Sequence, residues 1–236
     1  MAKKIITAND VNVGLNRFID DLLKIGASSK GDEFDKTVLT TLKKNLSGST
    51  LISTDRWCSR KKTSPFIEYN KKTLKNNYNF SDLKPLIDNG ESLDLVIVDK
   101  PNGSQKWPDL LVVFQGIGLP IEVKSSKTDL ILWNSGTPKS DSIYIFNNYG
   151  KARTTCFLGQ HAITDSELLY LINKSISAEN LNEKIPNSNR WSYYVRDMFN
   201  SNQSFFNNDE DRMKSEMDLK EFILELSWND SQKSIF

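Results

Sequence analysis

Three charged residues lie within two apolar segments that are joined by a short turn. The stretch PDLLVVFQGIGLPIEVKSS, residues 108–126, has the composition of two strands and carries Asp109, Glu122 and Lys124. Glu122 and Lys124 are two residues apart and therefore share one face of a strand, and the turn brings Asp109 beside Glu122. Because buried charges are costly without partners, these three side chains either form a surface ion pair or hold a ligand.

Two carboxylates with open coordination positions suit Mg²⁺, which takes few protein ligands and keeps several waters. The backbone carbonyl of Val123 is a further candidate ligand. Such an ion binds phosphate oxygens, lowers the pKa of a bound water and stabilises charge during displacement at phosphorus. Lys124 would orient that water or help to deprotonate it.

The composition excludes several other hydrolytic sites. The chain has a single histidine, His161, and two cysteines, Cys58 and Cys156, which excludes zinc sites with paired histidines and a disulfide framework. No Walker loop, GxGxxG or GxSxG motif is present. Hydrolysis must therefore use carboxylates and lysines, and His161 is expected to be structural rather than to face DNA.

These residues lie in a cluster of strand patterns that is preceded and followed by helical patterns. Helical spacing of apolar residues predicts helices over 8–25, 30–46, 164–175 and 209–228, with a short helix near 81–88 and an amphipathic stretch over 190–200. Strands are predicted over 93–98, 109–114, 119–125, 143–146 and 154–158. This order predicts an α/β (α+β) fold with a central mixed β-sheet flanked by helices. We expect one domain over 1–236, with a helical, basic part (1–90), the sheet (91–160) and a helical part (161–236).

The Pro108-Asp109 pair, a gap of twelve residues and the Glu122-Val123-Lys124 triplet resemble the PD-(D/E)XK nuclease superfamily. The continuation EVKSSKTDLILWNSGTPKSDSIYIF, 122–146, resembles type II restriction endonucleases, and the Gln-x-x-x-Tyr element of the exonuclease branch is missing. The resemblance implies a restriction-endonuclease-like fold in which Asp109 and Glu122 are metal ligands and Lys124 is catalytic. It also implies an acidic residue on a preceding helix, for which Glu33 in GDEFDKTVLTTL, 31–42, is the candidate.

The function implied by the resemblance is Mg²⁺-dependent, sequence-specific cleavage of double-stranded DNA, leaving 5′-phosphate and 3′-hydroxyl ends. It further implies a cognate DNA methyltransferase in the host. A homodimer would cut both strands of a palindrome most simply. The alternatives are a structure-selective or repair endonuclease, such as a junction resolvase or mismatch nickase, and an inactive DNA-binding protein.

Polar and basic residues near the motif are candidates for DNA contacts. The segment 134–141 and the hairpin tip 147–153 supply Asn134, Ser135, Lys139, Ser140, Asn148, Lys151 and Arg153. A stretch from Arg56 to Lys75, including Lys61 and Lys62, interleaves basic and aromatic side chains, which suits a phosphate backbone but equally a solvated loop. Turn formation is the alternative for the hairpin residues.

The charge of the C-terminal stretch and the lengths of the apolar runs limit where the protein can act. Residues 207–236 carry eight acidic and four basic side chains, and their apolar stripe of Phe222, Ile223 and Leu226 suits either the core or a dimer face. No apolar run approaches the ~18 residues that span a bilayer, and MAKKIITAND lacks a long apolar core. We therefore expect a cytoplasmic protein without membrane contact.

Overall fold

The computed structural model describes residues 5–26, 31–53, 87–88, 91–92, 94–103, 107–115, 117–133, 138–140, 142–184, 197–198 and 208–228. Its helices are α1 (Ala8–Ile25), α2 (Asp32–Asn45), α4 (Gly159–Ala162), α5 (Asp165–Glu183) and α6 (Asp209–Glu225). Its longer strands are β1 (Thr50–Ile52), β4 (Leu95–Asp99), β5 (Leu110–Phe114), β6 (Ile117–Ser126), β8 (Ile143–Asn148) and β9 (Arg153–Leu158). Two-residue strands are β2 (Ile87–Asp88), β3 (Glu91–Ser92), β7 (Leu132–Trp133) and β10 (Asp197–Met198).

The six longer strands form one mixed sheet in the order β1-β4-β5-β6-β8-β9. Strands β4, β5 and β6 form an antiparallel meander, β6 and β8 run parallel, and β8 and β9 form a hairpin. The short β1 pairs with β4 in parallel. The predicted mixed sheet flanked by helices is confirmed.

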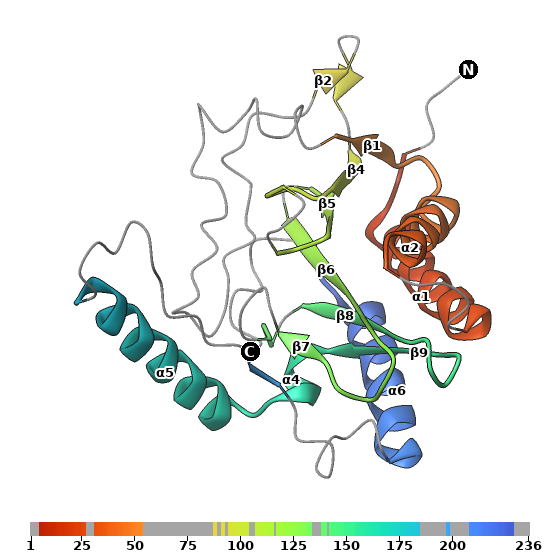
Figure 1. Ribbon diagram of the computed structural model, residues 1–236. Coiled ribbons are helices and arrows are strands. Elements are labelled where there is room, and N and C mark those ends of the chain that lie inside the picture. Colours follow the sequence, from red (N-terminus) through yellow and green to blue (C-terminus); the bar gives the residue numbers. More distant parts are fainter. Residues whose placement is uncertain are drawn as a thin grey trace.

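Helices α1, α2 and α6 share one core with the sheet, and Figure 1 shows them gathered on the side of the view away from α5. Strand residues alternate between the two faces, so Ile121 and Val123 of β6 join this core. Glu122 and Lys124 lie on the opposite face, where their register partners on β8 are Tyr144 and Phe146. That second face carries a smaller cluster of buried, mainly aromatic side chains. The charged residues of the motif lie on this face of the sheet.

The helix boundaries follow from local chemistry. Thr7 caps α1 by a reciprocal pair of hydrogen bonds with Asp10, and Gly26, at a φ of 64°, ends the helix. Thr164 and Glu167 form the same capping box at the start of α5. The helices predicted over 8–25 and 164–175 are confirmed, although α5 continues to Glu183.

Several predicted boundaries are wrong or incomplete. Ile87 and Asp88 form a strand rather than the end of the helix predicted near 81–88, and residues 81–86 lie outside the described residues. Asp197 and Met198 form the short strand β10 within the stretch 190–200, whose other residues are not described. Gly118 falls between the predicted strands 109–114 and 119–125, where a turn was expected, but it lies inside β6 and pairs with Val113.

The C-terminal part is tied to α1 by polar contacts. Asn12 donates to the Leu226 carbonyl at 2.9 Å and accepts from the Trp228 indole N–H at 2.7 Å. Ile223 is fully buried, and Phe222 packs against the same core. The core interpretation of the stripe Phe222, Ile223 and Leu226 is therefore confirmed. None of the described helices is long and apolar enough to cross a membrane.

Candidate functional site

The pairing of β5 with β6 brings the two carboxylates of the motif together. Leu110 pairs with Ile121, so Asp109 lies opposite Glu122 at the next position along the ladder. The backbone N–H of Asp109 donates to Oε2 of Glu122 at 3.2 Å, and Oδ2 of Asp109 accepts from the backbone N–H of Val123 at 2.8 Å. The two carboxylates are thus fixed by each other's strands.

Lys124 completes the group on the same face of β6. Its Nζ donates to Oε1 of Glu122 at 2.6 Å, and the side chains are only 10% and 4% exposed. A pair this buried needs close geometry, because removal of either partner leaves an uncompensated charge in a region of low dielectric. The expected convergence of Asp109, Glu122 and Lys124 is confirmed, and the ion pair is buried rather than superficial.

Burial raises the pKa of Asp109 to about 7, with a further contribution from the negative charge of Glu122. The hydrogen bond from Val123 and the charge of Lys124 act in the opposite direction without offsetting the effect. A carboxyl group with this pKa is half protonated near neutral pH. Ionisation of Asp109 is therefore unfavourable in the free protein, chiefly because the carboxyl group is buried and also because Glu122 is negative.

A third carboxylate approaches from α2, and it belongs to Asp35 rather than Glu33. Burial raises the pKa of Asp35, and the charge of Glu122 adds to the effect. Asp35 in turn contributes to the raised pKa of Asp109. Glu33 is exposed in the first turn of α2, and its carbonyl accepts from the Thr37 hydroxyl at 3.0 Å. Burial and electrostatic interaction with the motif thus favour Asp35 as the acidic residue of α2 that acts on the site.

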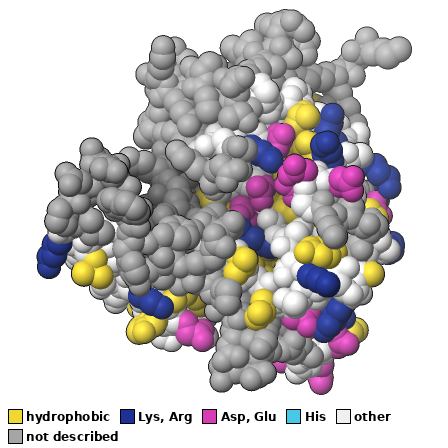
Figure 2. Space-filling view, viewed as in Figure 1, with side chains coloured by type: hydrophobic (Ala, Val, Ile, Leu, Met, Phe, Trp, Pro, Cys, Tyr) yellow, Lys and Arg dark blue, Asp and Glu magenta, His cyan; other side chains and the backbone are white. Residues whose placement is uncertain are grey.

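The turn after β4 supports the start of β5. The backbone N–H of Lys100 donates to the Asp109 carbonyl at 2.7 Å, and Asn102 donates to the Trp107 carbonyl at 2.7 Å. The Lys100 ammonium lies 3.9 Å from the Asp35 carboxylate. Figure 2 shows acidic side chains gathered beside Lys or Arg side chains in the upper part of the described surface.

The donor atoms of this group fit a hard divalent cation. Among the described residues no three His, Cys, Asp or Glu side chains are close enough to form a ready metal cage. Mg²⁺ needs no such cage, because it is bound by one or two carboxylates together with waters and substrate phosphates. Within the described part of the chain, Oδ2 of Asp109 accepts from the Val123 N–H and Oδ1 accepts no hydrogen bond. A cation here would also offset the repulsion that raises the pKa of Asp109.

The predicted DNA-contact residues have different positions. Asn134, Ser135, Lys61 and Lys62 lie outside the described residues. Lys139 is fully buried, so its side chain does not reach DNA in this conformation. Its backbone N–H donates to the Tyr144 hydroxyl at 2.8 Å. Ser140 is half-buried, and its carbonyl accepts from the Gln160 N–H at 3.2 Å.

The hairpin between β8 and β9 contains a charge cluster that was not predicted. Asn148, Lys151 and Arg153 all donate to the carboxylate of Asp129, which follows β6. Asn148 is buried, and its Oδ1 also accepts from the Lys151 N–H at 3.0 Å, which is ordinary turn chemistry. The sequence around Asp129 did not indicate this cluster, because the partners of Asp129 are about twenty residues further along the chain.

The single histidine is structural, as expected. Nδ1 of His161 accepts from the Leu158 N–H at 3.3 Å at the start of α4, and Nε2 lies 3.8 Å from the Asp218 carboxylate. Burial lowers the pKa of His161, so the neutral form is favoured at neutral pH. Neither contact involves the carboxylates of the motif.

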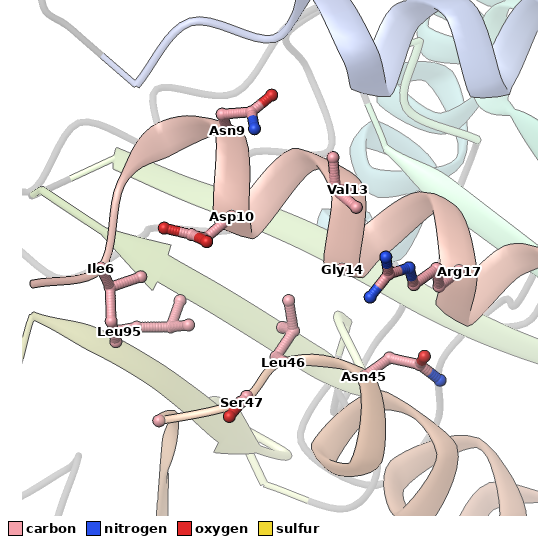
Figure 3. Close-up of a pocket in the computed structure, with 11 residues that line it drawn as sticks. Ile6, Asn9, Asp10, Val13, Gly14, Arg17, Asn45, Leu46, Ser47 and Leu95 are labelled. Atoms are coloured by element: carbon pink, nitrogen blue, oxygen red, sulfur yellow. The ribbon is translucent and has the colours of Figure 1, made fainter. Parts of the chain in front are cut away.

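A separate cavity of about 410 Å³ lies between α1, the end of α2 and the start of β4. Figure 3 shows Leu46 and Leu95 below α1, with Asp10 and Arg17 projecting from the helix. None of the predicted site residues lines this cavity. It lies beside the C-terminal end of α2, whereas Asp35 belongs to the first turn.

Comparison of the chain with family models, with curated proteins and with solved structures found no match.

Proposed function

We propose that this chain is a Mg²⁺-dependent endonuclease of type II restriction character. Its substrate would be double-stranded DNA, cleaved at a specific sequence to leave 5′-phosphate and 3′-hydroxyl ends. The observation that carries the proposal is the buried group formed by Asp109, Glu122 and Lys124 on two adjacent strands. The resemblance of Pro108-Asp109 and Glu122-Val123-Lys124 to the PD-(D/E)XK nucleases supplies the reaction class.

The residues have separate tasks in this proposal. Asp109 and Glu122 would hold the ion, together with the carbonyl of Val123. Asp35, rather than Glu33, would add negative charge from α2. Mg²⁺, when bound, supplies charge stabilisation at the phosphate and a lower pKa for a bound water. Lys124 would orient the attacking water beside the reacting phosphate or, from its neutral form, accept a proton from that water at Nζ.

The electrostatics of the free protein support a site that is completed by its ligands. At neutral pH, ionisation of Asp109 destabilises the folded chain, since burial and, to a smaller extent, repulsion from Glu122 raise the pKa of Asp109 to about 7. Such an arrangement is unfavourable for a purely structural ion pair. It is expected where a cation binds between the carboxylates.

The remaining parts of the proposal rest on the resemblance. A homodimer would place two such sites on the two strands of a palindromic sequence. A cognate methyltransferase would protect the host DNA without physical contact with this chain. The protein would act in the cytoplasm.

The test is digestion of unmethylated phage DNA by the purified protein, with and without Mg²⁺, followed by sequencing of the ends. Discrete Mg²⁺-dependent fragments are expected, and their ends give the recognition site and the stagger. A smear would indicate a structure-selective or nonspecific nuclease instead. Intact DNA that is still bound by folded protein would indicate an inactive DNA-binding protein.

The matched variants are Glu122→Gln and Glu216→Gln. Both replace a largely buried glutamate paired with a cation, since Glu216 accepts from Arg212 at 2.9 Å on α6. Glu122→Gln is expected to slow cleavage by at least about 100-fold while DNA binding in Ca²⁺ is retained. Glu216→Gln is expected to cleave at the rate of the unmodified protein. Equal rates for all three proteins would show that the motif is not the active site.

A further inference from the structure

The cluster around Asp129 has the composition of a binding site for an oxyanion. Nδ2 of Asn148 donates to Oδ1 of Asp129 at 2.7 Å, and an Nη of Arg153 donates to the same oxygen at 3.2 Å. The ammonium of Lys151 pairs with Oδ2. An amide, an ammonium and a guanidinium therefore converge on one carboxylate of the chain itself. A phosphate oxygen accepts from the same three kinds of donor.

This cluster lies at the end of the strands that carry the candidate site. Asn148 on β8 is the register partner of Ser126 on β6, two residues beyond Lys124, and Arg153 on β9 is the partner of Asn148. Two residues of strand correspond to roughly 7 Å. A DNA backbone held at Lys124 would therefore pass within reach of the three donors.

The hairpin and the segment of Asp129 are held against each other by backbone contacts. The Tyr149 N–H donates to the Ser126 carbonyl at 3.0 Å, and a Cβ at Gly150 would lie 2.0 Å from the Lys127 carbonyl oxygen. Asp129 lies in a bend with two hydrogen bonds to short side chains, from the Thr128 N–H to the Ser126 hydroxyl and from the Leu130 N–H to the Thr128 hydroxyl. The backbone that carries the three donors is thus held against the polar bend that carries the Asp129 carboxylate.

We propose that Asn148, Lys151 and Arg153 form a site for a DNA backbone phosphate, which the Asp129 carboxylate occupies in the free protein. The inference rests on the proposed function, because it takes DNA as the ligand. Asp129 is a displaceable anion that imitates the phosphate, and a bound phosphodiester replaces it. Asp129 does not touch the reacting atoms and acts only through the cations that it covers.

The physical consequence is control of nonspecific binding. Asp129 and Asp209 together balance the charges of Lys151 and Arg153, since Asp129 pairs with both cations and Arg153 also pairs with Asp209 of α6 at 3.0 Å. Neutralised cations release no counterions when DNA approaches, so they add little to sequence-independent affinity. They contribute only where other contacts hold the DNA long enough for a phosphate to displace Asp129. Asp129 thus favours the cognate site by weakening binding elsewhere.

The experiment measures binding of a fluorescein-labelled duplex of random sequence by anisotropy, in Ca²⁺, over a series of salt concentrations. Asp129→Asn is expected to bind roughly tenfold more tightly at low salt, with a slope of log K against log salt steeper by roughly one to two units. The double variant Asp129→Asn/Lys151→Gln is expected to lose most of that gain. Asp129→Ser repeats the test without an amide group near the three donors.

Asp21→Asn is the matched control. Asp21 accepts from Lys44 at 2.9 Å and from Asn45 at 3.1 Å between α1 and α2, so it has a similar donor pair away from the hairpin. The substitution Asp21→Asn removes one negative charge, as Asp129→Asn does, and is expected to leave DNA binding unchanged. An equal gain in Asp21→Asn would reduce the effect to net charge and overturn the inference.

The other outcomes are also decisive. Unchanged affinity and slope in Asp129→Asn would make the cluster purely structural. Failure of both Asp129→Asn and Asp129→Ser to fold would show that the carboxylate is required by the fold and cannot be displaced, which also overturns the inference. If the unmodified protein and every variant fail to bind duplex DNA, the proposed function itself fails.

Discussion

Asp109 and Glu122 face each other across the β5–β6 ladder, and the backbone N–H of Asp109 donates to Oε2 of Glu122 at 3.2 Å. Burial and the charge of Glu122 raise the pKa of Asp109 to about 7. The folded chain therefore binds a proton on Asp109 more strongly than the unfolded chain, in which an aspartate has a pKa of about 3.9. The contribution of Asp109 to stability therefore falls as the pH rises from about 4 to about 7 and the proton is lost.

Asp109→Asn is expected to stabilise the protein at neutral and higher pH. The amide keeps an oxygen for the Val123 N–H, which Asp109 bonds at 2.8 Å, but it removes the charge that is costly beside Glu122. The gain in the free energy of unfolding should be on the order of 1–3 kcal/mol at pH 8 and should vanish near pH 4. Urea denaturation at the two pH values, without divalent ions, measures it. A loss of stability at pH 8 would contradict the assigned electrostatics.

Divalent cations are expected to stabilise the free protein in a pH-dependent manner. Binding between Asp109 and Glu122 requires both carboxylates to be ionised, and a proton competes with the cation on Asp109 below about pH 7. Ca²⁺ should therefore raise the thermal midpoint more at pH 8 than at pH 6. At pH 8 a hundredfold excess over Kd should stabilise the folded protein by about 2–3 kcal/mol. Calorimetry with Ca²⁺ or EDTA measures this difference. Glu122→Gln should abolish the response, and an equal response in that variant would place the cation elsewhere.

The sheet was the part of the fold that local pattern predicted best. Strands such as β8 are apolar and rich in β-branched or aromatic residues, and they lie between clear turn residues. The short β1 was missed because three residues, Thr50–Ile52, carry no periodicity, and pairing with β4 alone makes them a strand. Gly118 was placed in a turn because of its residue type, but pairing with Val113 keeps it extended. Strand pairing overrides local propensity at both positions, by a distant strand for Thr50–Ile52 and by the adjacent strand of the hairpin for Gly118.

The candidate site was predictable only where its members are close in sequence. Glu122 and Lys124 share a face by strand periodicity, and the meander places Asp109 beside them. The choice of Asp35 over Glu33 depends on how α2 packs on the sheet, and a sequence window does not contain that rotation. Asp129 was missed because its partners come from the next hairpin, which also lies outside a local sequence window.

The two acidic residues of α2 can be separated by activity. Asp35→Asn is expected to slow cleavage by about tenfold or more, because Asp35 is the carboxylate of this helix whose charge acts on Asp109. Glu33→Gln is expected to have little effect, since Glu33 is exposed. Single-turnover rates on plasmid DNA, with thermal midpoints measured alongside, compare the two. The reverse order of rates would restore Glu33 as the acidic residue of the site.

Two substitutions in the hairpin are expected to have opposite signs. A Cβ at Gly150 would lie 2.0 Å from the Lys127 carbonyl oxygen, so Gly150→Ala must shift backbone and should cost about 1–3 kcal/mol. Ala152 has a φ of 50°, where glycine is favoured, so Ala152→Gly should be neutral or stabilising by up to about 1 kcal/mol. Urea denaturation of the two variants compares them directly. Because Lys151 lies between these positions, Gly150→Ala should also displace its ammonium from Asp129, whereas Ala152→Gly should preserve that pair. Two variants of equal stability would show that the hairpin does not pack on the segment of Asp129 in solution.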